Sequence, residues 1–306
     1  MFENTKQPVP ILVFHRGNAA YLEHCLNQAR KYNPESRIIL LGDSANAHIK
    51  VAEHYNADDF PGVKEFKPLY KHCSFLSYEF EWRCIERWFA LRDFIRLTGI
   101  TRFIHIDTDV LLFCNVTQEA ARFDGYDATV ARWDEQRLMA HFLLVNKAVF
   151  LEDFCNYMTG LYSNENEVQR LIQKNTNMNL RKKRMNKPWI SDMSLLCDYY
   201  DQRKTNFYFL ENTLKQGIGF DNRITDVEGF QAEWGLLRKH RIKKIRFENG
   251  LPTAWTVNSE RITMKMLHYH SLTKYLMQYH VRGIDAHWRF FWRELLFDHK
   301  IFMGRR

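Results

Sequence analysis

The sequence has little that would mark an extracellular, zinc-binding or membrane-spanning protein. Six of its 306 residues are cysteine, and no two of them form a CxxC pair or stand at the spacing of a zinc site. The first residues lack the charged-then-apolar pattern of a signal peptide, and no run approaches the roughly 20 apolar residues that span a bilayer. We therefore expect reduced thiols in a cytoplasmic protein, and regard the sequon Asn115-Val116-Thr117 as chance.

Linkers and internal repeats are also missing, while 45% of the residues are hydrophobic. A chain of this length can bury a sizeable core, so we expect a single domain over residues 1–306. Within it we distinguish residues 1–150, residues 151–270 and a helical C-terminal extension at 271–306. The net charge of +8 suits a nucleic acid, a membrane surface or a phosphate-bearing substrate equally, and it does not choose among them.

Short apolar runs at 9–14 and 37–41 predict buried strands. Apolar residues at helical spacing between these runs predict a helix that ends at Asn33-Pro34. A strand, a helix and a strand in this order form a unit with parallel strands and a right-handed crossover. The fold class is therefore α/β, with a central mixed, mainly parallel sheet flanked by helices.

The remaining patterns fill out this α/β order. We expect further helices over 47–56, 79–97, 148–162 and 191–200. We expect further strands at 102–106, 128–131 and 141–145, and short strands over 241–270 with Asn249-Gly250 as a hairpin turn. Residues 163–187, polar and then basic, predict a mobile loop or an excursion from the core. Residues 58–77 predict irregular structure or a short strand.

Two carboxylates follow the strand expected at 102–106. In an open α/β sheet, ligands bind beyond the carboxyl ends of the strands, where Asp107 and Asp109 stand. Residues i and i+2 of an extended segment point to the same side, so both can address one site. Carboxylates at close range repel one another, and Mg²⁺ or Mn²⁺ between them is a natural solution because these ions prefer oxygen ligands. The alternative is an exposed turn that happens to be acidic.

At this point the sequence resembles the GT-A glycosyltransferases, because Ile106-Asp107-Thr108-Asp109-Val110 is similar to their DxD strand. The resemblance covers most of the chain and implies a GT-A, Rossmann-like fold. It implies that Asp109 binds the metal directly. It implies that Asp107 contacts the donor sugar or ribose, or the metal through water. Thr108 then belongs to the nucleotide-sugar site.

A second segment strengthens the resemblance. Met266 to Lys274 is similar to a late H-x-x-G-x-x-K motif of some GT-A families, which implies that His268 is a third metal ligand and that Lys274 contacts the diphosphate. Ser271 replaces the glycine of that motif, so a side chain stands where the backbone would approach phosphate. The alternatives are His270 as the ligand, or a His268 satisfied by local hydrogen bonds.

A third acidic residue, Asp192, lies in Trp189-Ile190-Ser191-Asp192-Met193. It resembles the acceptor-side acidic position of related enzymes, which would hydrogen-bond donor-sugar hydroxyls or act as a base. The alternative is a helix start, in which Ser191 is the N-cap and Asp192 is favourable in the first turn.

The first strand–helix turn and the end of the second strand are expected to build the nucleotide site. The candidates are Phe14, His15, Arg16 and Asp43, with Arg16 toward phosphate and Asp43 toward a base N–H. Ordinary turn chemistry is the alternative for Asp43. Arg87-Trp88 resembles an Arg-Trp element that precedes the DxD strand in bacterial family members, which implies that Arg87 reaches the donor. The alternative role for Arg87 is an ion pair with Glu86 on the helix surface.

The resemblance implies sugar transfer from a nucleoside diphosphate sugar, UDP being favoured, to a glycan or glycolipid acceptor with Mn²⁺ or Mg²⁺. The sequence is similar to bacterial glycosyltransferases of cell-surface polysaccharide and lipopolysaccharide synthesis. The basic segment 181–187 would close over the donor. The aromatic and cationic run 287–297 would seat at a membrane interface beside a lipid-linked acceptor, or pack on the domain.

Three other functions compete with sugar transfer. A nucleotidyltransferase that makes nucleotide-sugars would need a glycine-rich phosphate loop, and residues 15–18 are poor in glycine. A nucleic-acid-binding protein would use Arg181 to Arg184, but this gives no reason for the two acidic residues at a strand end. We therefore expect no nucleic acid. A non-catalytic sugar-binding module would need neither metal nor nucleotide.

Overall fold

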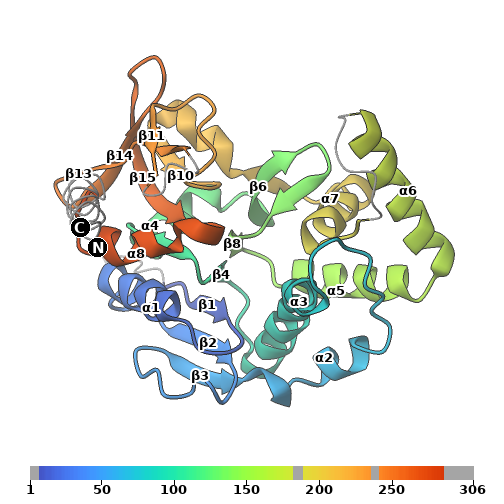
Figure 1. The fold of residues 1–306 in the computed structure, drawn as a ribbon. Helices are drawn as coiled ribbons and strands as arrows, with labels where there is room; N and C mark the ends of the chain where they lie inside the picture. The colour runs from blue at the N-terminus through green and yellow to red at the C-terminus, as the bar shows by residue number, and fades with distance from the viewer. Residues whose placement is uncertain (1–6, 182–188, 236–240, 286–306) are drawn as a thin grey trace, which may run out of the picture. The chain divides into compact units, whose positions relative to one another are not determined.

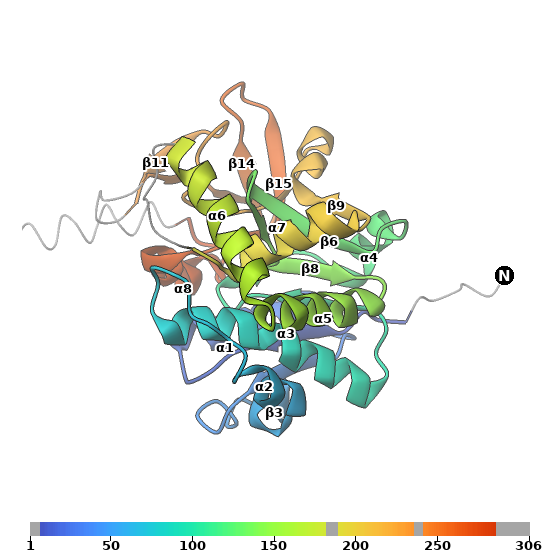
Figure 2. The same ribbon diagram turned by 90° about the vertical axis from the view of Figure 1, so that its right-hand side faces the viewer.

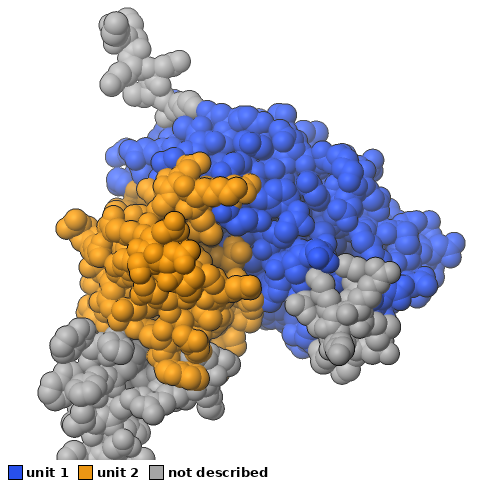
Figure 3. All heavy atoms as spheres, turned by 90° about the horizontal axis from the view of Figure 1, so that it is seen from above, with its two compact units in different colours: residues 1–19, 33–108, 115–211 blue, residues 20–32, 109–114, 212–306 orange. Residues whose placement is uncertain are grey.

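The computed structural model describes residues 7–181, 189–235 and 241–285. The chain divides into two compact units (Figure 3). Unit 1 comprises residues 1–19, 33–108 and 115–211, and unit 2 comprises residues 20–32, 109–114 and 212–306. The units interleave along the sequence, whereas the divisions expected at residues 150 and 270 are contiguous. The single domain over 1–306 stays a prediction.

Unit 1 is built on an eight-stranded sheet of order β3-β2-β1-β4-β8-β6-β7, with β9 pairing β6 (Figure 1). Strands β3, β2, β1 and β4 run parallel to one another, and β8 runs antiparallel to β4 and β6. This confirms the expected mixed, mainly parallel α/β sheet flanked by helices. The strands are β1 (Ile11–Phe14), β2 (Ile38–Gly42), β3 (Glu53–Asn56), β4 (Phe103–Ile106), β6 (Ala128–Asp134), β7 (Arg137–Met139), β8 (Phe142–Val145) and β9 (Phe207–Phe209).

The longest helix described in unit 1 is α3, which has Ser77 as its N-cap and Gly99 as its C-cap. The Ser77 side chain accepts a hydrogen bond from the Phe80 N–H, and Gly99 closes the helix at a φ of 68°, which costs a glycine little. The helices are α2 (Pro61–Phe66), α3 (Tyr78–Thr98), α4 (Val116–Ala120), α5 (Val149–Tyr162), α6 (Glu165–Arg181) and α7 (Asp192–Arg203), with 3₁₀ turns η1 (Ala57–Asp59) and η2 (Ala121–Phe123).

Helix α3 is buried on its charged side as well as on its apolar side. Ile85 and Trp88 belong to the core, and Trp88 packs edge-on against Phe154 of α5, the helix that runs beside α3 in Figure 2. Glu86 and Arg87, which lie off this apolar stripe, are also buried. The reason is that each of these two side chains has an opposite charge within reach inside unit 1, as described below.

Unit 2 is a second, smaller β structure. Its sheet has the order β10-β15-β14-β13 with β5 pairing β15, beside a separate β11-β12 pair. Asn249 and Gly250 have φ of 52° and 78° and join β13 to β14, which confirms the expected hairpin turn. The elements are α1 (Ala20–Tyr32), β5 (Val110–Leu112), η3 (Leu210–Gln216), β10 (Ile218–Phe220), β11 (Ala232–Trp234), β12 (Arg241–Lys243), β13 (Arg246–Glu248), β14 (Leu251–Trp255), β15 (Arg261–His268), η4 (Ser271–Leu276) and α8 (Met277–His280).

Two expected segments are wrong. The helix expected over 47–56 is a turn followed by β3, an edge strand that pairs in parallel with β2. Its partly exposed residues hide the strand pattern. Of the two alternatives for 163–187, the mobile loop is wrong as far as Arg181, where the chain forms helix α6, since Val168 and Leu171 are buried on one side of an otherwise polar helix. Residues 58–77, expected to be irregular, contain the short helix α2.

Several expectations fall on residues 182–188 and 286–306, which lie outside the described residues. These are most of the basic segment 181–187 and the aromatic run 287–297. Of the helical C-terminal extension, η4 and α8 are described. Over the described ranges, no helix is both long and apolar enough to cross a bilayer. All six cysteines are free thiols.

Gly42, at the end of β2, is needed for a close approach between neighbours. A Cβ on it would lie 2.0 Å from Asn46 Oδ1. The Asn46 amide donates hydrogen bonds to the carbonyls of His15 and Gly17, and its Oδ1 pairs with His54 Nε2. The glycine therefore makes room for the side chain that shapes the turn after β1.

Replacing Gly42 with alanine is expected to destabilise the protein by roughly 1–3 kcal/mol, because Asn46 must move and lose its hydrogen bonds. Chemical denaturation measures the change. Gly125→Ala is the matched control, since a Cβ there meets nothing within 4 Å. Equal effects of the two substitutions would contradict this role of Gly42.

Candidate active site

The Asp107-Thr108-Asp109 segment lies between two strands. Strand β4 ends at Ile106, the Asp107 N–H donates to the His141 carbonyl at 3.1 Å, and β5 begins at Val110. Asp107 stands one residue before the end of its segment of unit 1, and Asp109 opens a segment of unit 2.

In unit 1, the buried Arg87 guanidinium joins two carboxylates. One NH2 group donates to Asp107 Oδ1 and the other to Asp192 Oδ2. Burial acts to lower the pKa of Arg87, but Asp107 and Asp192 outweigh it, so the pKa is raised and the side chain stays charged. The alternative pairing of Arg87 with Glu86 on the helix surface is wrong, because Glu86 binds Arg16 instead.

Asp192 combines a capping position with this ion pair. Ser191 accepts from the Ser194 N–H and Ser194 accepts from the Ser191 N–H, a capping box at the start of α7. The expected helix cap is thus confirmed. Burial raises the pKa of Asp192 while Arg87 acts to lower it. The net effect is a raised pKa, so both roles named for Asp192, a hydrogen-bond acceptor for hydroxyl groups and a base, stay open.

Glu81 of α3 is an acidic neighbour that the sequence analysis missed. It is buried and accepts a hydrogen bond from Ser74 Oγ at 2.9 Å. Burial, with Asp192 as the next cause, raises the pKa of Glu81 to about 7. The signal was available, because Glu81 stands four and seven residues before Ile85 and Trp88 on their apolar stripe.

The four candidates for the nucleotide site lie at the ends of the neighbouring parallel strands β1 and β2. Phe14 is buried and His15 is half-buried. Asp43 accepts from the Gly17 N–H at 2.7 Å and from the Ala45 N–H at 3.0 Å, which is the turn chemistry named as its alternative. Arg16 pairs with Glu86 and with Asp58, so a phosphate would compete with these carboxylates.

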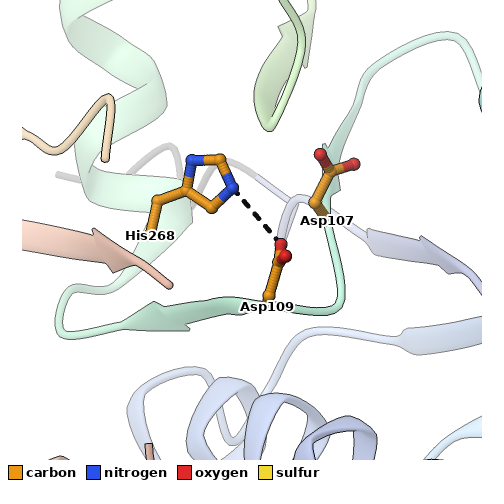
Figure 4. A group of neighbouring side chains, drawn as sticks. All are labelled: Asp107, Asp109 and His268. Atoms are coloured by element: carbon orange, nitrogen blue, oxygen red, sulfur yellow. Dashed lines mark ion pairs between the residues drawn. The ribbon is translucent and has the colours of Figure 1, made fainter. Parts of the chain in front are cut away.

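In unit 2, the side chains of His268 and Lys274 converge on Asp109. His268 Nε2 lies 3.3 Å from Asp109 Oδ1, the pair drawn in Figure 4, and Lys274 Nζ lies 3.0 Å from Asp109 Oδ2. Burial acts to lower the pKa of Lys274, but Asp109 outweighs it and the pKa is raised. Lys274 also lies over the Tyr21 ring, with Nζ 4.3 Å from its centroid.

The backbone fixes which nitrogen of His268 carries a proton. Nδ1 lies 2.5 Å from the carbonyl oxygen of Asn222, which only accepts hydrogen bonds, so Nδ1 must be the donor. In the neutral ring, Nε2 then presents its lone pair to the Asp109 carboxylate. A lone pair opposite a carboxylate is unfavourable unless a cation or a proton lies between them. The side chains therefore favour either a metal ion or a protonated His268.

A buried ion pair between Asp221 and Lys243 lies next to the His268 backbone. The His268 N–H donates to Asp221 Oδ2 at 3.1 Å, and Lys243 Nζ binds Asp221 Oδ1 at 2.6 Å. Asp221 and Asn222 follow strand β10 directly, so they have the strand-then-acid pattern that drew attention to Asp107. The sequence analysis did not apply that pattern here and missed both residues.

The structure bears on two points in the late motif, the serine that replaces its glycine and the choice between two histidines. Ser271 has a φ of 55°, in the left-handed region that favours the glycine of the resembled motif. The His270 residue is exposed overall, but partial burial of its ring lowers its pKa, with His268 as the next cause. Because His268 makes the ion pair with Asp109, it is a better ligand candidate than His270.

Asp107, Asp109 and His268 each offer one ligand atom, and these atoms lie within 4.8 Å of one another. Two carboxylates and an imidazole suit Mn²⁺, and carboxylates alone also suit Mg²⁺. The donor set therefore fits the metal that the sequence resemblance implied.

No protein-family model matches the sequence, and no curated protein matches it. Several solved structures are similar. Mouse xyloside xylosyltransferase 1 is 13% identical with a TM-score of 0.46, over 71% of this chain and 88% of that one. The galactosyltransferase LgtC, in complex with donor and acceptor sugar analogues, is 11% identical with a TM-score of 0.42, over 92% and 99%.

A third similar structure is the glycosyltransferase GlyE of Streptococcus pneumoniae, at 15% identity and a TM-score of 0.37, over 72% of this chain and 49% of that one. The printed names of the three are a xylosyltransferase, a galactosyltransferase and a glycosyltransferase.

Glu81 is expected to make stability fall as pH rises. A carboxyl whose pKa is raised by folding, here from 4.5 to about 7, binds more protons in the folded state between those values. Its contribution is full below the lower value and is lost as pH rises through the higher one. Glu81→Gln should therefore flatten the fall in free energy of unfolding between about pH 5 and pH 8. The exposed Glu79→Gln is the control, and equal slopes for the wild type and Glu81→Gln would refute the assignment.

Asp221→Ala is expected to lower the free energy of unfolding by about 3 kcal/mol, because it leaves the buried Lys243 ammonium without an opposite charge, although its hydrogen bond to the Arg223 carbonyl remains. Glu248→Ala is the matched control, since it breaks the exposed Arg261–Glu248 pair and should cost less than about 1 kcal/mol. Denaturant titration measures both variants. Similar losses would mean that the Asp221–Lys243 pair does not support the site.

Proposed function

We propose that the protein is a metal-dependent glycosyltransferase that uses a nucleoside diphosphate sugar. One observation carries this proposal: the Asn222 carbonyl orients His268 so that Nε2 faces Asp109 at 3.3 Å, beside Lys274. An imidazole lone pair, a carboxylate and an ammonium together suit a divalent cation and the phosphates that it carries.

Asp109 and His268 would hold Mn²⁺ or Mg²⁺ directly, with Asp107 as a further ligand or as a contact to the donor sugar or ribose. When bound, such an ion neutralises charge that develops on a departing diphosphate. Mn²⁺ is the better candidate because imidazole is among the ligands.

Lys274 would bind the diphosphate. Its ammonium is held by Asp109, and a cation that binds Asp109 would release it toward phosphate. The Tyr21 ring beneath Nζ keeps the lysine within the same region.

Asp192 would accept hydrogen bonds from hydroxyl groups of the donor sugar, and Arg87 would hold Asp192 and Asp107 in place. Since Arg87 is buried between two carboxylates, neither carboxylate needs to reorganise when the substrate binds. Phe14, His15, Arg16, Asp43 and Thr108 remain proposed contacts to the nucleotide-sugar.

We propose UDP as the nucleotide and a glycan or lipid-linked glycan as the acceptor, as in cell-surface polysaccharide or lipopolysaccharide synthesis. A cytoplasmic location with peripheral membrane contact fits such an acceptor. These finer assignments rest on the sequence resemblance alone.

Calorimetric binding of UDP, GDP and dTDP, each with and without Mn²⁺, tests the proposal. One nucleotide is expected to bind in a Mn²⁺-dependent way. His268→Ala and Asp109→Ala should weaken this binding more than about tenfold, because each removes a ligand. The control His270→Ala should leave the binding unchanged.

Nucleotide binding that ignores Mn²⁺, or that is lost equally in His270→Ala, would count against this metal site. No binding of any of the three nucleotides would count against the transferase itself.

A further inference from the structure

Unit 2 contains a hollow that shares no residue with the candidate active site. Its volume is about 390 Å³, and it is lined by Gln231, Lys244, Arg246, Trp255 and Ser259. These residues come from the ends of β12 and β14, the start of β13 and the neighbouring turns. Its lining includes an indole, an amide, a hydroxyl and two cations.

Backbone hydrogen bonds hold the walls of the hollow. The Gln231 N–H donates to the Trp255 carbonyl at 2.8 Å, and the Lys244 N–H donates to the Gln231 carbonyl at 2.9 Å. A β-bridge between Phe230 and Thr256 lies beside them. The three side chains thus stand on paired backbone, which lowers the cost of ordering them around a ligand.

The two cations differ in their partners. Arg246 binds both oxygens of Glu233, at 3.2 and 2.9 Å, and lies 3.6 Å from Asp285. Its charge is therefore compensated. For the Lys244 ammonium, no hydrogen-bond or ion-pair partner occurs among the described residues. Counting only the described ranges, the hollow therefore has one uncompensated positive charge, that of Lys244, which a ligand can neutralise.

We propose that this hollow is a second binding site, for an anionic saccharide unit. An indole face packs on the C–H face of a sugar ring, an amide and a hydroxyl exchange hydrogen bonds with its hydroxyl groups, and an ammonium pairs with a carboxylate or phosphate. Trp255, Gln231, Ser259 and Lys244 supply these groups in that order. A few polar groups that converge around an aromatic side chain are the usual composition of a small-ligand site.

The site is separate from the transfer chemistry. Trp255 pairs with Arg261 at the start of β15, and His268 ends the same strand. Seven residues of extended chain span roughly 23 Å. The proposal therefore goes beyond the proposed function and does not depend on metal or nucleotide.

The test titrates the full chain with glucuronate, glucose 6-phosphate, glucose and inorganic phosphate, by calorimetry and saturation-transfer NMR. Glucuronate or glucose 6-phosphate is expected to bind more tightly than glucose or phosphate, and the stronger of the two identifies the anionic group. Lys244→Gln should weaken that binding about tenfold, as expected for the loss of one charged hydrogen bond. Trp255→Ala should abolish it.

Two controls keep the outcome clear. Trp234→Ala removes an exposed indole outside the lining and should change nothing. Asp109→Ala should also retain saccharide binding, even if it loses nucleotide binding. The proposal is overturned if neither acidic sugar binds, if glucose or phosphate binds as tightly, or if well-folded Lys244→Gln and Trp255→Ala bind like the wild type.

Discussion

The antiparallel pairing of β5 with β15 is the constraint on which the candidate site depends. β5 begins directly after Asp109, and His268 stands opposite Val110 in the register of the two strands. The Tyr269 N–H then donates to the Asp109 carbonyl at 2.8 Å. These backbone bonds bring a residue from early in the chain beside one about 160 positions later. A slip of one residue in this register would turn His268 to the other face of the sheet.

Each unit also contains a charged side chain that is buried and keeps its charge. Arg87 in unit 1 and Asp221 in unit 2 are both desolvated, and each has opposite charges in contact. Such groups contribute little net stability, because desolvation offsets most of the attraction. What they provide is a fixed direction for Asp107 and Asp192 in one unit and for His268 in the other. Preorganised charge of this kind is what electrostatic catalysis requires.

Much of this could be predicted from local sequence. Apolar runs marked β1, β2 and β4, Asn249-Gly250 marked a hairpin, and Ser191 marked a helix start, since each depends on neighbours in the chain. Strand β3 and helix α6 were missed because their residues are mostly polar, and tertiary pairing decides their structure.

Within the candidate site, Asp107, Asp109 and His268 could be named from a strand end and a motif. The groups that hold these side chains in place could not be predicted from the sequence. The Asn222 carbonyl that sets the His268 tautomer is a backbone group, and no side-chain pattern reveals it. The choice of Asp107 and Asp192 over Glu86 as partners of Arg87 depends on how α3 packs, which a single helix sequence does not encode.

The central claim is that His268 Nε2 and the Asp109 carboxylate share a divalent cation. Anomalous X-ray scattering from crystals soaked in Mn²⁺ and UDP tests it most directly. The account predicts a Mn²⁺ peak within about 2.0–2.3 Å of both His268 Nε2 and an Asp109 oxygen. A Mn²⁺ peak elsewhere with nucleotide bound, or a His268 that still contacts Asp109 with no metal between them, would contradict it.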